Sequence, residues 1–526
     1  MTNKTLNVKA TWIIASAVMF SRILGLIREV LFNTIFGTSS MGIFLIAFRA
    51  PNLFRDLFAE GALSISFITV FSKKLETEND ASAWDLASKM LTLTMVCMSL
   101  LCIVGILYTE HLIAILAPGF AAQDVAAVVF LTKLMYPFIL LVSLAAIVMG
   151  MLNSKNIFGA PALASSFFNI GSIVGGTICG WIIDPQFGKQ ALTGLAIGTL
   201  IGGGMQLIVQ LPSLRRVGFR FKLNFNWRDA GIRKILILSV PAIIAASAVQ
   251  INVLINSSFA SFIGTEAVTW LNSAFRLMQF PIGVFGVAVA TITLPVLSRI
   301  AATKDHAHFG LTLGRAMRLA VFLTLPAAVG LWFFSQPIIS LIYEHGKFHT
   351  VDSMQTAVAL QFYAIGLVAY ACIKVLAPGF YAIDKKWIPM WISFFAIGLN
   401  LMLNYFLIFK IKMGHSGLAL ATTVSANINF LLLYLCMNYT HDLQSMRFIS
   451  NFLRCGIAAI IMGVVCWLIN LNYTNLLYHP MLLTRLSAML GAIVCAGSIY
   501  LLICLILRVE TMYSIFSIVH KKLQLK

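Results

Sequence analysis

Long blocks of apolar residues recur along the whole chain, and they constrain its fold more than any other feature. Of the 526 residues, 60% are hydrophobic and only 10% are charged, whereas about 25% of the residues of a soluble domain are usually charged. Many blocks reach the roughly 20 residues that an α-helix needs to cross a bilayer. Because a helix satisfies its own backbone hydrogen bonds in lipid, the sequence predicts an all-α polytopic membrane protein.

The apolar blocks predict about 14 transmembrane helices. These are expected at residues 11–37, 41–72, 86–109, 127–152, 161–183, 191–212, 235–263, 266–298, 314–334, 354–382, 387–409, 415–438, 452–471 and 482–507. The domains are predicted as a six-helix lobe at 1–212, a basic cytoplasmic linker or interfacial segment at 213–234, a six-helix lobe at 235–440, and helices 13 and 14 with a cytoplasmic tail at 441–526.

The second long block of each half has a related texture. One reads FRAPNLFRDLFAEGALSISFITVFSKK and the other FRLMQFPIGVFGVAVATITLPVLSRI. Both begin Phe-Arg, reach a proline soon after, pass through small residues and end beside bases. Two lobes related by pseudo-symmetry are therefore expected, and transporters of that kind bind their substrate at the interface between the repeats.

The chain is strongly basic, with a formal net charge of +19 from 37 Lys and Arg against 18 Asp and Glu. These bases collect in alternate segments between the predicted helices, as they do in short cytoplasmic loops that fix topology. We expect both termini to be cytoplasmic, the first helix to be retained rather than removed as a signal peptide, and no nucleic-acid partner. The stretch RRVGFRFKLNFNWRDAGIRK is predicted, with equal weight, as a plain linker or as an interfacial helix on an anionic leaflet.

Motifs for enzymatic chemistry are missing from the sequence. There is no Walker A loop, no H-E-x-x-H run and no G-x-S-x-G elbow. The nine cysteines show no C-x-x-C spacing, which predicts neither disulfides nor a zinc site. Two histidine pairs, His306 with His308 and His345 with His349, lack an obvious third ligand. We expect a transporter rather than an enzyme, with no cofactor and no metal site.

The first two apolar blocks contain four arginines, Arg22, Arg28, Arg49 and Arg55. A charged side chain at bilayer depth costs about 2.5–3.5 kcal/mol on insertion scales, so we expect these residues to face a watery cavity. The two arginines of each pair lie about 120° apart around an ideal helix, and they could border a cavity from two sides. Arg276, in the second half, is a fifth arginine within a predicted span. Guanidinium groups are charged at any relevant pH and fit phosphate oxygens.

The carboxylates near these arginines are fewer than the arginines themselves. Glu29, Asp56 and Glu60 could hold the guanidinium groups in position, but they leave an excess of positive charge. The binding of an anion is therefore favoured over purely structural pairing.

Other polar residues within the predicted spans are less informative. Lys374 could snorkel toward the interface or face the lumen of the second lobe. Asn400, Asn404, Thr422 and Thr423 are expected to make interhelical hydrogen bonds rather than an ion site.

Three stretches carry a resemblance to a known family. They are SRILGLIREVLF, then FRAPNLFRDLFAEGALSISFI, and the pairing of TEAVTWLNSA with FRLMQFPIGVFGVAVATITLP. With them the chain resembles the MurJ-type lipid II flippases of the multidrug/oligosaccharidyl-lipid/polysaccharide exporter superfamily, from the first helix through the twelfth and in the final pair. The resemblance implies two six-helix lobes in a V shape, and helices 13 and 14 that form a groove for a polyprenyl tail.

The function that this resemblance implies is transport of lipid II, the polyprenyl diphosphate-linked disaccharide-pentapeptide precursor of peptidoglycan. Such a protein moves lipid II from the inner to the outer leaflet of the bacterial inner membrane by alternating access, for cell wall biogenesis and cell shape. The partners expected are lipid II and membrane lipids, and the protein is expected to be monomeric. Carrying a diphosphate outward moves negative charge in the direction that an inside-negative potential favours.

The resemblance also implies a set of substrate-binding residues. By position in the matching motifs they are Arg22, Arg28, Arg49, Arg55, Glu60 and Arg276. The chain departs from the family pattern at Gly42 and Gln279, where acidic residues are common. Asn256 and Asn404 stand where some members bind sodium with aspartates, which puts sodium coupling in doubt.

Three other functions compete with this one. A flippase for another polyprenyl diphosphate-linked oligosaccharide would need the same arginines. A cation-coupled drug antiporter of the same superfamily would need carboxylates in its lumen, whereas the first lobe is net positive in its spans. An enzyme acting on a polyprenyl phosphate would need an acidic metal-binding run, which the sequence lacks.

Overall fold

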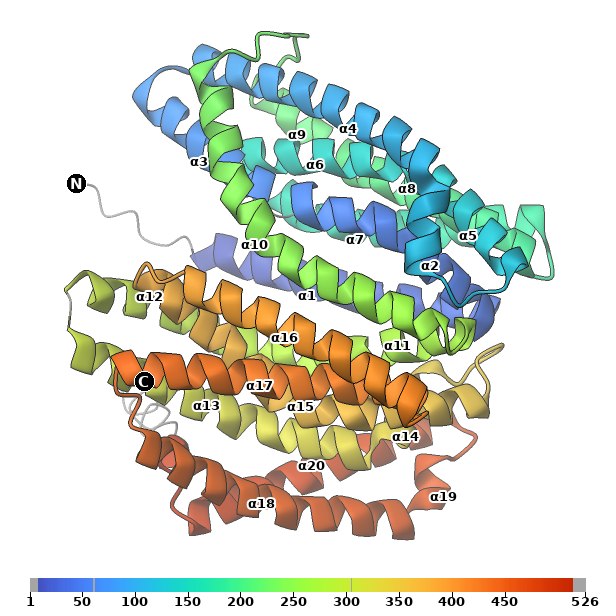
Figure 1. The fold of residues 1–526 in the computed structure, drawn as a ribbon, viewed down its shortest axis with the longest axis vertical. Helices are drawn as coiled ribbons and strands as arrows, with labels where there is room; N and C mark the ends of the chain where they lie inside the picture. Colours follow the sequence, from blue (N-terminus) through green and yellow to red (C-terminus); the bar gives the residue numbers. More distant parts are fainter. Residues whose placement is uncertain (1–7, 60–61, 304, 514–526) are drawn as a thin grey trace. The chain divides into compact units, whose positions relative to one another are not determined.

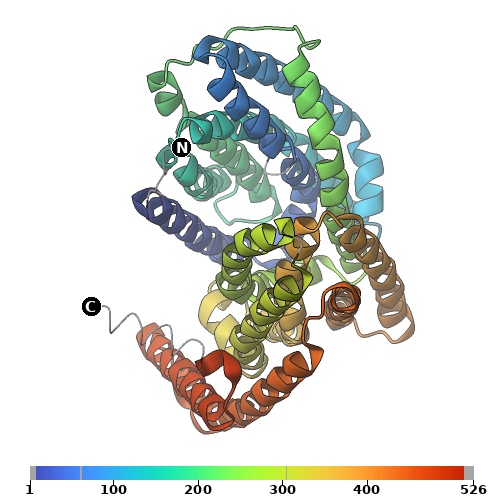
Figure 2. The same cartoon turned by 90° about the vertical axis from the view of Figure 1, so that its left-hand side faces the viewer.

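The computed structural model describes residues 8–59, 62–303 and 305–513, and every regular element in them is a helix (Figure 1, Figure 2). The chain divides into two compact units, Met1–Thr269 and Trp270–Lys526. The boundary falls within α11, a helix that runs over Thr265–Pro281.

The first unit begins with α1 and contains all of α10. Its elements are α1 (Val8–Phe36), α2 (Thr38–Phe54), η1 (Arg55–Ala59), α3 (Ala62–Thr77), α4 (Asp80–Leu116), α5 (Ala122–Met135), α6 (Pro137–Ser154), α7 (Gly159–Ile183), η2 (Lys189–Ala191), α8 (Leu192–Ile208), α9 (Leu211–Arg216) and α10 (Ala230–Ser261).

The second unit contains most of α11 and every later helix. These are η3 (Ile282–Gly286), α12 (Val287–Ala302), α13 (His306–Phe333), α14 (Ser335–Tyr343), α15 (Thr350–Ala382), α16 (Trp387–Tyr405), η4 (Phe406–Lys410), α17 (His415–Thr440), α18 (Ser445–Asn472), α19 (Thr474–Leu477) and α20 (Leu482–Ile506).

Within the described residues, eleven helices are long and apolar enough to cross a membrane. They are Asp80–Leu116, Ala122–Ser154, Gly159–Ile183, Lys189–Arg216, Thr265–Ala302, His306–Phe333, Thr350–Ala382, Trp387–Lys410, His415–Thr440, Ser445–Asn472 and Leu482–Ile506. Each coincides with one predicted block, and the remaining blocks at 11–37, 41–72 and 235–263 fold as α1, as α2–η1–α3 and as α10. The prediction of an all-α membrane protein is confirmed.

The second long helix of each half contains a proline followed by a π-helical turn. Pro51 precedes η1, and Pro281 directly precedes η3. Because proline has no backbone N–H, the carbonyl four residues earlier loses its helical partner. At Pro51 that carbonyl belongs to Ala47, and it accepts a hydrogen bond of 3.1 Å from Thr132 Oγ1 of α5 instead. The carbonyl that Pro51 frees is therefore satisfied by a tertiary contact. The π-helical turn η1 follows, and such turns are frequent at functional sites.

Helices α7 and α8 approach each other closely through glycines. A Cβ atom added to Gly198 would overlap the backbone of Gly176, and one added to Gly194 would overlap the backbone of Gly180. Small residues spaced four apart allow membrane helices to pack at this separation, where van der Waals contact holds them together.

The predicted final helix pair is present as α18 and α20. The two helices pack against each other and against α13 (Figure 1). Tyr500 of α20 stacks near Phe322 of α13, with ring centroids 5.7 Å apart, and its hydroxyl donates a 2.9 Å hydrogen bond to the Phe322 carbonyl.

The segment at 213–234 contains no interfacial helix of the predicted length. Helix α9 ends at Arg216, and residues 219–226 have no regular structure. Phe219 is buried and its ring lies 5.3 Å from that of Trp84, so this part of the linker packs on α4. Of the two alternatives for this stretch, the helical one is wrong over residues 217–229, where Phe219 packs on α4 while Phe221, Phe225 and Trp227 are exposed.

Candidate functional site

Helix α1 carries the first two predicted arginines, and their side chains differ in exposure. The side chain of Arg22 is exposed, whereas that of Arg28 is half-buried. The Arg28 guanidinium carbon lies 5.0 Å from the centre of the Phe168 ring on α7. Such a cation–π contact holds the charged group beside an aromatic face without neutralising it. Glu29, the next residue, is buried with 7% of its surface exposed.

At the start of η1, Arg55 forms an ion pair with Asp56, the next residue in the chain. Arg55 Nη2 and Nε donate hydrogen bonds of 3.0 and 3.3 Å to Asp56 Oδ1. This bears out the expectation that a nearby carboxylate positions Arg55. Arg49 lies on α2, two residues before Pro51, and its side chain is half-buried.

The Asp56 carboxylate also connects three segments of the first unit. Its Oδ2 atom accepts a hydrogen bond of 3.2 Å from Asn52 Nδ2 on α2 and one of 3.1 Å from Gln250 Nε2 on α10. Asn52 and Gln250 were not predicted as site residues. Asn52 lies one helical turn before Asp56 and could have been inferred from that spacing, but nothing in the sequence indicates Gln250.

The remaining predicted residues lie elsewhere. Arg276 is on α11 in the second unit, and its side chain is exposed there. Lys374 is exposed on α15. Glu60 lies outside the described residues. Within the first unit, the structure thus joins Arg55 to Asp56 and sets Arg28 against Phe168.

The sequence matches one known protein family over most of its length. The family model described as lipid II flippase MurJ matches residues 32–487. The chain belongs to the MurJ family. A lipid II flippase MurJ of Burkholderia cenocepacia is 32% identical over 504 residues, which cover 94% of this chain and 96% of that protein.

Two further similarities extend the comparison. A probable lipid II flippase MurJ of Buchnera aphidicola subsp. Acyrthosiphon pisum is 34% identical over 79% of this chain and 80% of that protein. A solved lipid II flippase MurJ in an inward closed conformation matches with a TM-score of 0.75 and 27% identity, over 93% of this chain and 98% of that one. An inward-facing multidrug resistance MATE family transporter matches with a TM-score of 0.68 but only 14% identity, which shows a shared fold alone.

The packing around Gly42, a position where the resemblance leads us to expect an acidic residue, leaves no room for a side chain. Gly42 is buried on α2, and a Cβ atom added to it would overlap the carbonyl of Thr265. Nearby, Ser39 Oγ lies 2.8 Å from Thr265 Oγ1, and Thr269 Oγ1 donates a 2.7 Å hydrogen bond to the Thr38 carbonyl. No acidic side chain fits at Gly42 in this packing, because the backbone of α11 begins where the side chain would lie.

Among the polar residues of α16 and α17, Thr423 makes an interhelical hydrogen bond of the kind that the sequence predicts. Thr423 Oγ1 donates to the Phe362 carbonyl of α15 at 2.8 Å, as expected. Thr422 bonds the Leu418 carbonyl of its own helix, and Asn404 Nδ2 bonds Asn400 Oδ1 within α16 at 3.0 Å. Residues spaced four apart meet on one helix face, which explains these local contacts.

Histidines of both pairs named in the sequence make hydrogen bonds within the second unit. His306 Nδ1 lies 3.0 Å from His441 Nε2, and the backbone N–H of His349 donates to Asp352 Oδ2 as part of a helix cap. Across the described residues, no group of three or more His, Cys, Asp and Glu side chains is arranged to hold a metal ion.

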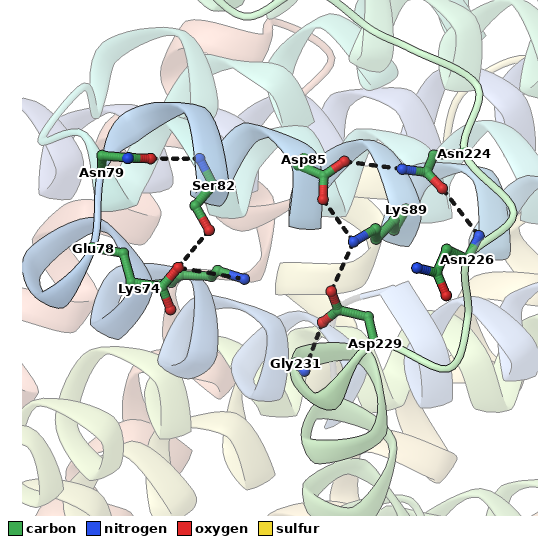
Figure 3. A network of polar contacts seen from close by, with 10 residues as sticks. All are labelled: Lys74, Glu78, Asn79, Ser82, Asp85, Lys89, Asn224, Asn226, Asp229 and Gly231. Atoms are coloured by element: carbon green, nitrogen blue, oxygen red, sulfur yellow. Dashed lines mark hydrogen bonds and ion pairs between the residues drawn. The ribbon is translucent and has the colours of Figure 1, made fainter.

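Buried charges outside the predicted site were missed by the sequence reasoning. Lys89 of α4 is 6% exposed, and its Nζ lies 2.6 Å from Asp85 Oδ2 and 2.7 Å from Asp229 Oδ2 (Figure 3). Arg318 of α13 is 2% exposed. Both lie at the basic ends of apolar blocks, where a charged side chain normally reaches water, so only the tertiary structure shows that they are buried.

Proposed function

We propose that this protein moves lipid II from the inner to the outer leaflet of the bacterial cytoplasmic membrane by alternating access. The observation that carries the proposal is the group of arginines on α1, α2 and η1 within a chain of the MurJ family. It acts as a transporter for cell wall synthesis, not as an enzyme.

The arginines supply the chemistry that a diphosphate head group requires. A guanidinium is planar, always charged and able to donate two parallel hydrogen bonds to phosphate oxygens. Phe168 and Asp56 support the guanidinium groups of Arg28 and Arg55. Held in this way, the two groups lose little conformational freedom when the ligand binds, which raises affinity.

Arg22, Arg49, Arg276 and Glu60 complete the proposed substrate-binding set. Arg276 is included because α11–η3–α12 repeats the arginine, proline and π-helical turn of α2–η1–α3. Glu60 is included on the family resemblance of its motif.

The finer membrane organisation is also part of the proposal. Adding α1, α2–η1–α3 and α10 to the helices identified as apolar spans gives about 14 crossings, the number predicted from the apolar blocks. The domains are the lobes at 1–212 and 235–440, the linker at 213–234 and the final pair at 441–526. Both termini are cytoplasmic by the distribution of Lys and Arg, the protein acts as a monomer, and α18 with α20 holds the polyprenyl tail.

Arginine replacement tests the proposal directly. In cells depleted of the native protein, the Arg28→Ala and Arg276→Ala variants should fail to restore lipid II exposure on the outer leaflet, although both insert and accumulate. Loss of one charge-assisted contact costs about 1.5–3 kcal/mol, or roughly 10- to 150-fold in affinity. Arg28→Lys should rescue poorly, because an ammonium cannot make the forked contact.

Arg299→Ala is the matched control, since Arg299 is an exposed base in the last turn of α12. Full activity of an Arg28→Ala, Arg276→Ala double variant would overturn the proposal. A flippase for another polyprenyl diphosphate-linked oligosaccharide is the second candidate, because the same guanidinium groups would bind its diphosphate. Normal lipid II exposure with loss of a different surface glycan would favour that candidate.

A further inference from the structure

Helix α12 packs against α13 in the second unit (Figure 1). Two cavities lie along this contact. The first has a volume of about 410 Å³ and is lined almost wholly by apolar side chains, among them Val284, Phe285, Ala288 and Leu323. The second has a volume of about 310 Å³. Ile292, Thr293 and Leu319 line both, so the two form one continuous groove.

Three charged residues line the second cavity in the part of the chain that the structure describes. They are Arg315 and Arg318 of α13 and Glu510, which follows α20. Two guanidinium groups against one carboxylate leave an excess of one positive charge. The groove is therefore apolar along most of its length and cationic at one end.

Arg318 has an unsatisfied donor in this cavity. The residue is 2% exposed, its Nε lies 3.8 Å from Glu510 Oε2, and its Nη1 atom has no hydrogen-bond partner among the described residues. A buried guanidinium without full pairing is strongly unfavourable, since desolvation is not repaid. An anion that accepted a hydrogen bond from Nη1 would satisfy both the charge and the donor.

The apolar part of the groove opens beside an exposed apolar face of α12. Ile292 is 74% exposed, and its neighbours Leu294 and Val296 are 38% and 43% exposed. They lie on Thr265–Ala302, one of the helices apolar enough to cross the membrane. An exposed apolar face beside a groove is typical of a site for an apolar ligand or a membrane contact, so the acyl chain of a lipid fits this groove.

We infer that the groove between α12 and α13 binds one anionic phospholipid. Its phosphodiester accepts hydrogen bonds from Arg315 and Arg318, and an acyl chain lies along Val284, Ala288 and Leu323. A phosphodiester carries a single negative charge, which balances the single excess positive charge of the cavity. Basic pockets between membrane helices bind lipid head groups on the same physical basis. The site is lined mainly by η3, α12 and α13, with Glu510 and Thr511 just after α20 at its charged end. It is therefore distinct from the tail groove proposed between α18 and α20.

Equilibrium binding of radiolabelled phosphatidylglycerol to the full chain in non-ionic detergent tests this inference. Phosphatidylcholine with the same acyl chains is the comparison, because its choline neutralises the phosphate. Phosphatidylglycerol should bind at least about tenfold more tightly, as expected when a charge-assisted contact is gained. Arg318→Gln should abolish that preference, and Arg299→Gln, on exposed Arg299 of the same unit, should leave it intact.

Two further variants keep the test decisive if Arg318→Gln fails to fold. Glu510→Gln removes the competing carboxylate from a half-exposed side chain and should tighten phosphatidylglycerol binding severalfold. Ile292→Trp fills the junction of the two cavities and should weaken it.

Equal binding of the two phospholipids, or no response to Glu510→Gln and Ile292→Trp, would overturn the inference. Competition by glycerol phosphate as strong as that by phosphatidylglycerol would also overturn it, because the head group alone would then suffice. Displacement by undecaprenyl diphosphate at much lower concentration would instead assign the groove to the transported lipid.

Discussion

Asp56 shows how a single carboxylate organises the cationic region of the first unit. It contacts Arg55 within its own π-helical turn, Asn52 one turn earlier, and Gln250 on α10. Both members of the Arg55–Asp56 pair are partly buried, with side-chain exposures of 22% and 27%. The carboxylate therefore sets the direction of a guanidinium group proposed to bind substrate while it joins η1 to α10.

Replacement of Asp56 should separate these two roles. Asp56→Ala removes all three contacts and should lower the free energy of unfolding by about 1–2 kcal/mol, given partial solvent screening. Asp56→Asn keeps an oxygen for Gln250, so its stability should stay closer to the parent while transport still falls. Thermal unfolding of the purified protein and a lipid II exposure assay measure the two effects.

Asp124 offers a control, since it pairs at 2.7 Å with Lys189, whose side chain is 57% exposed. Asp124→Ala should change stability by no more than about 1 kcal/mol. Identical stability and transport in Asp56→Ala and Asp56→Asn would argue against separate roles.

At the scale of elements, a buried ion pair joins α4 to the start of α10 (Figure 3). Lys89 of α4 reaches Asp229, whose side chain also caps α10 by accepting from the Gly231 N–H at 2.7 Å. Asp85 completes the cluster and accepts a hydrogen bond of 2.9 Å from Asn224 Nδ2 of the linker. The linker between the two predicted lobes is thereby fixed to α4.

Loss of the lysine should destabilise this junction. Lys89→Met leaves Asp229 with a partly buried charge and should lower the free energy of unfolding by about 3 kcal/mol. Lys73→Met changes an exposed lysine on the neighbouring helix α3 and should have little effect. Thermal unfolding compares the two variants, and equal stabilities would show that the cluster contributes nothing measurable.

The same cluster makes stability depend on pH. Burial alone would raise the pKa of Asp229, but hydrogen bonds from Lys89 and from the Gly231 N–H outweigh it and hold this pKa below its usual value. A carboxyl with a lowered folded pKa stabilises the fold above its unfolded pKa of about 3.9, and the effect is lost as the pH falls through the folded pKa.

We therefore expect the stability difference between the parent protein and Asp229→Asn to be constant above about pH 5 and to shrink below pH 4. Unfolding temperatures measured across this range test the expectation. A difference that shrinks as the pH rises would contradict the sign.

The close contact between α7 and α8 should make stability sensitive to the size of the residue at position 198. Gly198→Val should force the two helices apart, because a side chain there would overlap the backbone of Gly176. Overpacking of this kind costs about 1–3 kcal/mol or more, visible as a lower unfolding temperature. Gly204→Val on the same helix has nothing within 4 Å of the added Cβ and serves as the control. A normal unfolding temperature for Gly198→Val would show that the helices can separate at little cost.

For the whole molecule, the distribution of bases predicts which loops face the cytoplasm. Asn226 lies in the basic linker and Lys347 in the segment between α14 and α15, and both are exposed. In intact spheroplasts a membrane-impermeant maleimide should label Lys347→Cys and not Asn226→Cys, with the parent chain giving the background of its native cysteines. The reverse pattern would invert the topology proposed from the positive-inside rule.

The fold class and the positions of the helices follow from the sequence alone, because length and apolar character are local properties of each block. The in-span arginines and the proposal that they bind phosphate also follow from it, since a guanidinium group is charged at any relevant pH. By contrast, Gln250 and Asp56 are 194 residues apart, and Lys89 and Asp229 are 140 residues apart. Those pairs, the burial of Arg318 and the backbone contact that requires Gly42 exist only once distant helices have packed, and no local pattern encodes such packing.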